Sequence, residues 1–269
     1  MAKILEFFFI PDLKKFPNLF RKLVYRDFFE RFVGSALGFL WAILNPLVLM
    51  GMYVLLFSVI LKIRFIEGGT HVDFGLYLFC GMIPWLAFQE SLVKCSNIIF
   101  AYRNLILHIR LPLGFLPLHI AVSAVIQELI ALVLFIGFVW QYKGLDVQGL
   151  PFLFLIVPIK ILFTCGFNFF LTPITVFYRD IVQLVQIMMI CWFFSSPIVY
   201  PISQVPGEYL SLYRLNPFVS FVECYRHAIL GDPGWNWSSY LYVLGISLVL
   251  YILGFYYFKR SEKHILQYI

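Results

Sequence analysis

Two ionisable side chains, Glu128 and Lys160, lie well inside long apolar segments and are the first candidates for chemistry in this sequence. At about 1.5 Å per helical residue, they lie roughly 18 and 14 Å from the same end of a predicted helical hairpin. A lone charge at the middle of a bilayer costs about 2.5–3.5 kcal/mol on insertion scales, so we expect the two to form an ion pair. A proton or ion relay is the alternative. Relays need ionisable groups at several depths, so we favour a structural pair.

The sequence contains none of the short motifs that would give the chain a reaction of its own. It lacks the GxxxxGK[ST] phosphate loop, the HExxH zinc motif and the GxSxG nucleophile motif. Its 5 histidines and 5 cysteines form no cluster with metal-ligand spacing. We therefore expect a protein that is not an enzyme and that itself binds no ATP, metal or other cofactor.

The elements that position these residues are predicted to be membrane-spanning helices. Hydrophobic residues make up 62% of the chain and charged residues 13%, whereas a soluble domain has about 25% charged residues. A helix needs about 20 mainly apolar residues to cross the ~30 Å hydrocarbon core. The predicted fold class is all-α, a polytopic membrane protein with six transmembrane helices at residues 34–61, 74–97, 113–140, 151–176, 181–200 and 239–258.

The distribution of positive charge predicts how these helices are oriented. Lys and Arg gather before the first predicted span, in the 101–111 and 177–180 connections, and after the last span. With six spans, all four regions lie on one side of the membrane. Cytoplasmic segments carry an excess of Lys and Arg, so both termini are predicted to be cytoplasmic. Topology accounts for the net charge of +6, and no nucleic-acid partner is expected.

Two segments outside the spans have patterns of their own. Phe16, Phe20, Val24, Phe28 and Phe32 recur every four residues, which predicts an amphipathic helix in the membrane interface with its apolar face in lipid. A simple positively charged anchor beside the first span is the alternative. The long connection 201–238 mixes four prolines with apolar residues, which favours short re-entrant helices on the outer side, before the last span.

Aromatic residues form 20% of the chain. Most are expected to lie at the membrane interfaces or to face lipid. Sugar rings have apolar C–H faces that stack on aromatic rings, so a subset could instead line a passage for a carbohydrate. The most prominent candidates for such a passage are Trp41, Tyr53, Trp85 and Trp192.

Several passages resemble the membrane subunits of ABC-2 type polysaccharide exporters, which carry O-antigen, capsule or teichoic-acid chains. They are LVYRDFFERFVGSALGFLWAILNPLVLMGMYVLLFSVI (residues 23–60), GMIPWLAFQESL (81–92), RNLILHIRLPLGFLPL (103–118), FYRDI (177–181), SSPIVYPISQVP (195–206) and NPFVSFVECYRHAIL (216–230). The resemblance divides the chain into a cytoplasmic tail with interface helix (1–33), a transmembrane domain (34–258) and a cytoplasmic C-terminal tail (259–269). An outer gate segment (201–232) lies within the transmembrane domain.

The resemblance implies a permease subunit that works as a homodimer with two copies of a separate ATPase subunit, which would hold ATP and Mg. It implies a bacterial inner-membrane location and a lipid-linked, O-antigen-like polysaccharide as cargo. The residues expected to contact the ATPase are Arg21, Arg26, Arg103, His108 and Arg110. Tyr178, Arg179 and Asp180 would lie near the inner entrance, and the expected outer gate residues are Pro201, Pro206, Tyr209, Asn216, Pro217 and Arg226.

Two other functions remain open from the sequence. The first is the drug- or lipid-exporting branch of the same superfamily. The second is an ion-coupled secondary transporter or an intramembrane enzyme. Secondary transporters often contain internal repeats, and the halves 1–135 and 136–269 show none. An intramembrane enzyme would need more clustered polar groups than Glu128 and Lys160 supply.

Overall fold

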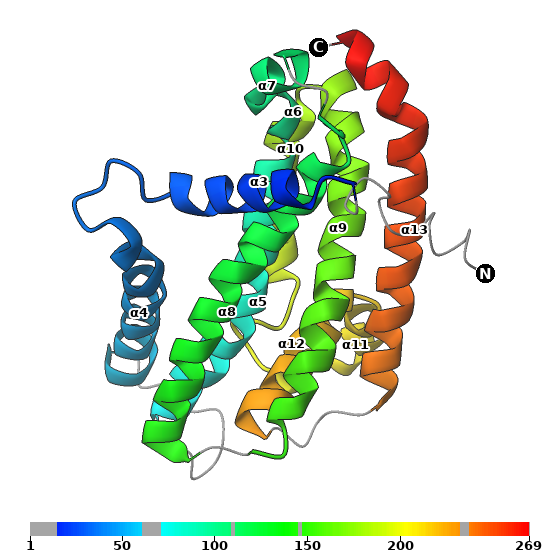
Figure 1. The fold of residues 1–269 in the computed structure, drawn as a ribbon. Coiled ribbons are helices and arrows are strands. Elements are labelled where there is room, and N and C mark those ends of the chain that lie inside the picture. The colour runs from blue at the N-terminus through cyan, green and yellow to red at the C-terminus, as the bar shows by residue number, and fades with distance from the viewer. Residues whose placement is uncertain (1–14, 61–70, 109–110, 145–146, 232–236, 269) are drawn as a thin grey trace.

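The structure is a computed structural model that describes residues 15–60, 71–108, 111–144, 147–231 and 237–268. Within these ranges the chain is helical, with turns and short irregular connections and no strand. The longest helices run side by side along the length of the molecule (Figure 1). They are α5 (His71–Cys95), α8 (Phe115–Lys143), α9 (Leu153–Phe177) and α13 (Trp237–Tyr268).

Five helical segments in the described ranges are long and apolar enough to cross a membrane. They are Gly38–Leu56, Phe74–Cys95, Phe115–Tyr142, Leu150–Phe177 and Trp237–Ile265. The first combines η1 (Gly38–Leu40) with α4 (Trp41–Tyr53) and the start of a π-helical stretch, η2 (Val54–Ile60). The fourth combines η3 (Leu150–Phe152) with α9. The five segments coincide with five of the six predicted spans, because a bilayer requires long uninterrupted apolar helices and the sequence supplies them.

The predicted span at 181–200 is shorter than expected. Helix α10 (Ile181–Phe194) has 14 residues, which gives a length of about 21 Å, less than the ~30 Å of hydrocarbon. It ends before Pro197, whose ring disfavours helical backbone at the preceding residue. The chain continues without helix to η4 (Ile202–Gln204). The count of six complete spans therefore stays a prediction.

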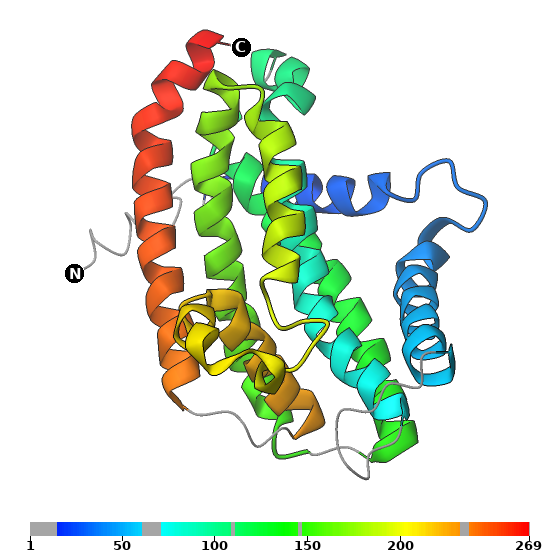
Figure 2. The same cartoon turned by 180° about the vertical axis from the view of Figure 1, so that it is seen from behind.

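Two short helices, α11 (Gly207–Arg214) and α12 (Pro217–Leu230), precede the last long helix. The side chain of Asn216 caps α12 by accepting a hydrogen bond from the Phe218 N–H, and Pro217 occupies the first turn. Gly231 ends the helix in the left-handed conformation, with φ of 67°. Figures 1 and 2 place α11 and α12 at the opposite end of the bundle from α6 (Ile98–Ala101) and α7 (Arg103–His108).

Helix α3 (Pro17–Glu30) runs across the bundle rather than along it (Figure 1). Its predicted apolar stripe exists, but much of it packs against α8 instead of facing lipid. Leu23, Val24 and Phe28 are buried. The expectation that this face lies in lipid is therefore wrong for these three residues, because the facing surface of α8 covers them. Phe16 at the start of the stripe remains 47% exposed.

Helix α4 is separated from the rest of the bundle over part of its length (Figures 1 and 2). Only 11% of its most apolar window is buried, compared with 72% for α5. Its contacts are with α5, α8 and the short elements on either side of it. Among the spans, α4 is thus held by the fewest packed side chains.

The most extensive interface joins α9 and α13, and it depends on two glycines. A Cβ atom added at Gly254 would collide with the backbone carbonyl oxygen of Gly166. One added at Gly166 would lie 2.7 Å from the Leu250 carbonyl carbon. Small residues of this kind let two membrane helices approach closely enough for their backbones to touch.

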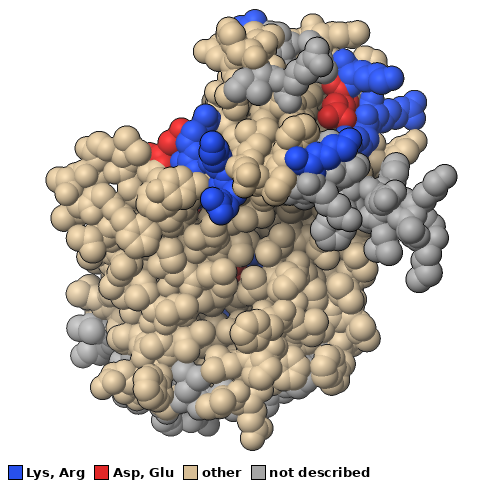
Figure 3. All heavy atoms as spheres, viewed as in Figure 1, with Lys and Arg blue, Asp and Glu red and all other residues tan. Residues whose placement is uncertain are grey.

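Charged side chains on the face shown in Figure 3 gather towards one end of the molecule, and the larger part of the face shows almost none. Helices α6 and α7, the turn between α9 and α10, and the C-terminal end of α13 lie at that same end (Figure 1). It is the end that the sequence predicts to be cytoplasmic, and we refer to it as the inner end. The uncharged part has the length and composition of a surface that contacts lipid.

Candidate functional site

Glu128 of α8 and Lys160 of α9 meet at the centre of the bundle. The Lys160 ammonium donates a hydrogen bond to Oε2 of Glu128, and their side chains are 1% and 0% exposed, respectively. The hydroxyl of Tyr225 in α12 donates to the other carboxylate oxygen at 2.6 Å. Both oxygens of Glu128 are therefore occupied, and the group connects three helices. The sequence indicated the charge pair but not Tyr225, because nothing in its local pattern distinguishes it from the other aromatic residues.

A second polar group joins α3 to the bundle near the inner end. Asp27 accepts hydrogen bonds from Ser123 of α8 at 2.5 Å and from Lys94 of α5 and Arg31 at 3.4 Å each. Arg31 also pairs with Glu90 at 2.8 Å, and Glu90 pairs with Lys94 at 3.0 Å. We call these five residues the α3 latch. Asp27 with Arg31, and Glu90 with Lys94, are each four residues apart in one segment. The contacts that join α3 to α5 and α8 link residues distant along the chain, which no local pattern indicates.

The latch favours the charged form of Asp27. Burial by itself would raise the pKa of this carboxyl, but the Ser123 hydrogen bond and the positive charges of Lys94 and Arg31 more than offset that effect. The pKa of Asp27 therefore lies below its ordinary value. At neutral pH Asp27 is therefore ionised, and this is the form that interacts most strongly with Lys94 and Arg31.

The residues that the resemblance assigns to an ATPase contact have different surroundings. The guanidinium of Arg26 lies over the Tyr102 ring, 4.5 Å from its centroid, and pairs with Glu30 at 2.9 Å, so Arg26 is engaged within the chain. Arg21 on α3 is exposed, as are Arg103 and His108 on α7. Arg110 lies outside the described residues.

The predicted substrate-path residues fall into three places. Trp85 has no exposed surface and packs in an aromatic cluster with Phe88 and Phe218. Trp192, half-buried beside it, donates a hydrogen bond to Asn216 at 2.9 Å. In a single chain, Trp85 is therefore buried behind other side chains and does not itself form part of the surface.

The remaining path candidates lie nearer the surface. On α4, Trp41 is 38% exposed and donates to Ser35 at 2.8 Å, while Tyr53 is half-buried. Three more residues, Tyr178, Arg179 and Asp180, are exposed at the inner turn between α9 and α10. There the Arg179 guanidinium lies 5.1 Å from the centroid of the Phe100 ring.

Arg226, an expected outer gate residue, is an internal anchor. It is 1% exposed and donates to the backbone carbonyls of Pro197, Ile198 and Tyr77 at 2.8, 3.0 and 3.2 Å. Its guanidinium also lies 3.5 Å from the centroid of the Tyr77 ring. Arg226 thus holds the irregular segment after α10 against α5. Asn216 and Pro217 form the start of α12, so they too set the shape of this region.

The other outer gate candidates line a shallow pocket. Pro206 and Tyr209 lie beside Tyr200, Gln204 and Tyr213 around a cavity of about 510 Å³. Pro201 is the residue immediately before η4. Tyrosine hydroxyls of this group contact one another, since Tyr200 donates to Tyr213 at 3.1 Å.

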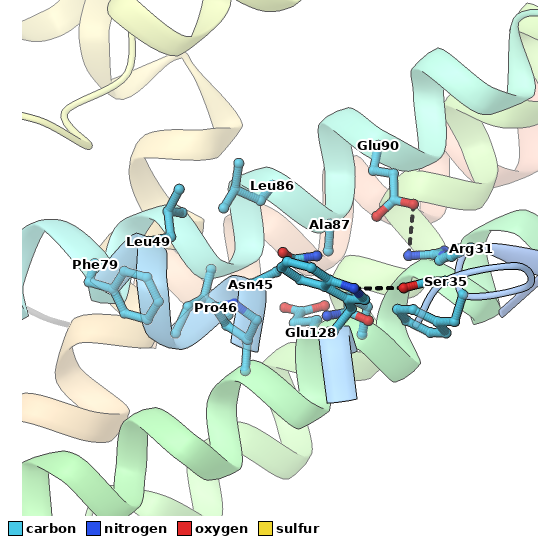
Figure 4. A pocket seen from close by; sticks show the side chains of 15 residues that line it. Arg31, Ser35, Asn45, Pro46, Leu49, Phe79, Leu86, Ala87, Glu90 and Glu128 are labelled. Carbon is cyan, nitrogen blue, oxygen red and sulfur yellow. Dashed lines mark hydrogen bonds and ion pairs between the residues drawn. The ribbon is translucent and has the colours of Figure 1, made fainter. Parts of the chain in front are cut away.

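A larger pocket of about 650 Å³ separates α4 from α5 and α8. Figure 4 shows Arg31, Ser35 and Glu90 at one end of this pocket and Phe79, Pro46 and Leu49 towards the other. The remaining lining residues are Phe32, Trp41, Asn45, Ile83, Leu86, Ala87, Gln127, Glu128 and Ala131. Arg31 and Glu90 of the latch and Glu128 of the buried charge pair are therefore among the residues that line this pocket. We call it the α4 pocket.

This bundle of apolar helices, with charge gathered at one end and polar groups joining the helices inside, defines a polytopic membrane protein. The chain belongs to the ABC-2 type transporter family, whose membrane-domain model matches residues 18–230.

Three relatives extend this result. The chain is 30% identical over 219 residues to the O-antigen export system permease protein RfbA of Myxococcus xanthus. The aligned region covers 81% of this chain and 82% of that protein. It is 24% identical over 242 residues to RfbA of Klebsiella pneumoniae, covering 88% and 89% of the two chains. It is also 24% identical over 256 residues to the polysialic acid transport protein KpsM of Escherichia coli, covering 91% and 93%.

Proposed function

We propose that this chain is the permease subunit of an ATP-driven exporter that moves a lipid-linked, O-antigen-like polysaccharide across the bacterial inner membrane. The observation that carries the proposal is the similarity to polysaccharide export and transport proteins over more than four fifths of both chains. The sequence shows no phosphate loop, which supports a separate ATPase as the source of energy.

That polypeptide is proposed to be an ABC ATPase, present in two copies with two copies of this chain. ATP and Mg belong to the ATPase. Its docking surface would include the exposed Arg103 and His108 on α7 and Arg21 on α3. Force applied to α3 reaches α5 and α8 through the α3 latch, because Asp27 and Arg31 contact both helices. Both termini would then be cytoplasmic, which agrees with the gathering of Lys and Arg predicted from the sequence.

The polysaccharide path is proposed to run between the two copies. Helix α10 supports this because it has a row of exposed apolar residues that the single chain leaves uncovered: Leu184, Ile187, Met188, Ile190 and Phe194. Near the inner end, Tyr178 and Arg179 are exposed where a lipid-linked anionic group would arrive. Trp85 of α5 packs against Trp192 of α10 and would support this helix from inside the bundle.

A deletion and complementation experiment tests the proposal. A strain lacking this gene is expected to accumulate undecorated or lipid-linked glycan on the cytoplasmic face, and the intact gene is expected to restore surface glycan. Transport in vesicles should require ATP and the ATPase from a neighbouring reading frame, and should persist when the ion gradient is collapsed. Normal surface glycan in the deletion strain, with loss of drug or lipid efflux instead, would favour the other branch of the superfamily. Loss of transport on collapsing the ion gradient would favour a secondary transporter.

A further inference from the structure

The shallow pocket beside α11 has a lining that suits a sugar unit. We call it the tyrosine pocket, and it is formed by residues of the segment between α10 and α12: Tyr200, Gln204, Val205, Pro206, Tyr209 and Tyr213. Among these described residues none is a lysine, arginine, aspartate or glutamate. The pocket therefore offers aromatic faces, hydroxyls and an amide but no charge, which fits an uncharged ligand that carries both C–H faces and hydroxyl groups.

Two polar side chains of the tyrosine pocket, Gln204 and Tyr209, are accessible to such a ligand. Both are exposed, Tyr209 by 55%, and neither has a side-chain hydrogen bond with another described residue. A tyrosine ring is an apolar body with a polar tip, so Tyr209 can stack on the C–H face of a sugar ring. The Gln204 amide has both donors and an acceptor for the sugar hydroxyls.

The other two tyrosines form a fixed wall of the pocket. The Tyr200 hydroxyl donates to the Phe194 carbonyl at 2.9 Å and lies 3.1 Å from the Tyr213 hydroxyl. Their rings meet edge to face, with 6.4 Å between the centroids. Because these two rings contact each other, Tyr209 is the ring that remains free to stack on a ligand.

The backbone around the pocket is also held in place. Arg226 anchors the carbonyls of Pro197 and Ile198, and the Asn216 amide donates to the Ser196 hydroxyl at 3.0 Å. The proline rings of Pro201 and Pro206 restrict φ on either side of η4. A site that is already ordered loses less conformational entropy when a ligand binds.

The location of the pocket points to the exported chain as the source of the ligand. The hydrogen bond from Tyr200 to the Phe194 carbonyl places the pocket at the C-terminal end of α10, the helix whose exposed apolar row is proposed to face the polysaccharide path. Helix α11 lies towards the end of the bundle opposite the inner end (Figure 2). The volume of about 510 Å³ falls within the roughly 300–1,000 Å³ that is usual for ligand sites.

We propose that the tyrosine pocket binds one uncharged pyranose unit of the polysaccharide where the chain leaves the bundle. The sugar ring stacks on Tyr209, and its hydroxyls bond to the Gln204 amide. This inference rests on the proposed function, because the exported chain supplies the ligand. Stacking on a single exposed ring gives a weak and reversible contact, which a moving polymer requires.

Binding of the strain's own glycan tests the site. The full-length protein is purified in the assembly that it forms in the membrane and is kept in lipid nanodiscs. The probe is the surface polysaccharide of the parent strain, cut by mild acid to oligosaccharides of a few units. Saturation-transfer difference NMR, with irradiation of the aromatic protons of the protein, should show transfer to the C–H protons of the sugar. Added choline should not reduce this transfer.

Variants of the two accessible side chains locate the sugar. Tyr209→Leu removes the stacking ring and should weaken oligosaccharide binding about tenfold, which corresponds to about 1.4 kcal/mol, whereas Tyr209→Phe keeps the ring and should retain most of the binding. The matched control is Tyr142→Leu, because Tyr142 is a 45% exposed tyrosine of α8 outside the pocket. It should leave binding unchanged. If Tyr209→Leu fails to fold, Gln204→Met, which removes the amide and should weaken binding several-fold, replaces it.

Three results would overturn this site and leave the proposed function intact. The first is no saturation transfer to the oligosaccharides when deletion of the gene abolishes the surface glycan. The second is equal binding by the Tyr209→Leu and Tyr142→Leu variants. The third is displacement of the oligosaccharide by choline, which would identify the pocket as an aromatic site for quaternary ammonium cations. Normal surface glycan in the deletion strain would instead overturn the proposed function, and the ligand assignment with it.

Discussion

Removal of the positive member of the buried charge pair is expected to destabilise this protein strongly. Lys160→Met keeps the side chain's length and apolar character but leaves the Glu128 carboxylate, whose side chain is 0% exposed, without its counter-charge. Removing one partner of a buried pair costs about 3–5 kcal/mol, mostly because the other charge remains buried. The Tyr225 hydrogen bond stays, so Glu128 retains one donor, and we expect the lower half of that range.

A double-mutant cycle separates the pair from the side chains that form it. Glu128→Gln with Lys160→Met removes both charges, and replacement of a whole buried pair by neutral groups is often neutral or stabilising. We therefore expect the double variant to be more stable than Lys160→Met alone. The free energy of unfolding is measured for each variant by titration with sodium dodecyl sulfate in mixed micelles, followed by circular dichroism.

The control is another lysine-to-methionine change at a partly exposed pair. Lys259 lies 2.9 Å from Glu262, with side chains 32% and 27% exposed, and such pairs contribute about 0–1 kcal/mol. Equal losses for Lys160→Met and Lys259→Met would refute the reasoning. So would additive losses in the cycle, because they would mean that Glu128 and Lys160 do not interact.

Three further predictions concern the latch, the glycine contact and the anchor. Asp27→Asn should destabilise the protein by about 1–3 kcal/mol at pH 7 by weakening the latch. The pKa of Asp27 is lowered from 3.8 on folding, so its stabilisation is complete above that pH and is lost as pH falls through the folded value; melting curves of the two proteins should converge in acid and differ at neutral pH. Gly254→Ala should cost about 1–3 kcal/mol by overpacking against α9, while Gly245→Ala, in the same helix with open space around it, should stabilise by about 0.5–1 kcal/mol; equal Tm values for the two would contradict the packing argument. Arg226→Met should expose the segment after α10 to proteolysis several-fold faster, because buried carbonyls lose donors worth about 1–3 kcal/mol each, whereas the exposed Arg214→Met should leave the cleavage rate unchanged.

The sequence predicts those features of the fold that depend on long, uninterrupted patterns. Five of the predicted spans coincide with long helices because the bilayer requires continuous apolar segments. The 181–200 span is different, since its apolar composition continues past Phe194 while the helix ends there, three residues before Pro197. Composition and backbone geometry disagree there, and composition alone predicts the wrong length.

The surface that an amphipathic face contacts is harder to predict than the face itself. The four-residue repeat of α3 is correctly recognised, yet Leu23 and Phe28 meet α8 instead of lipid. Lipid and a neighbouring apolar helix are equally suitable for such a face, and the sequence does not distinguish them. Polar partners between distant segments, such as Asp27 with Ser123 and Tyr225 with Glu128, are missed for the same reason.

Helix α13 has 32 residues without an internal proline or break, so at about 1.5 Å per residue it forms a rod of roughly 48 Å. Its outer part contacts α12, and its inner part extends beyond the bilayer thickness of ~30 Å. At Gly166 and Gly254 its backbone contacts that of α9, so the two helices must tilt together as one rigid unit. On the opposite flank, beside α4, the π-helical η2 follows the first span. Mechanical compliance is therefore concentrated on one flank, and a polymer could be admitted there while the other flank keeps its shape.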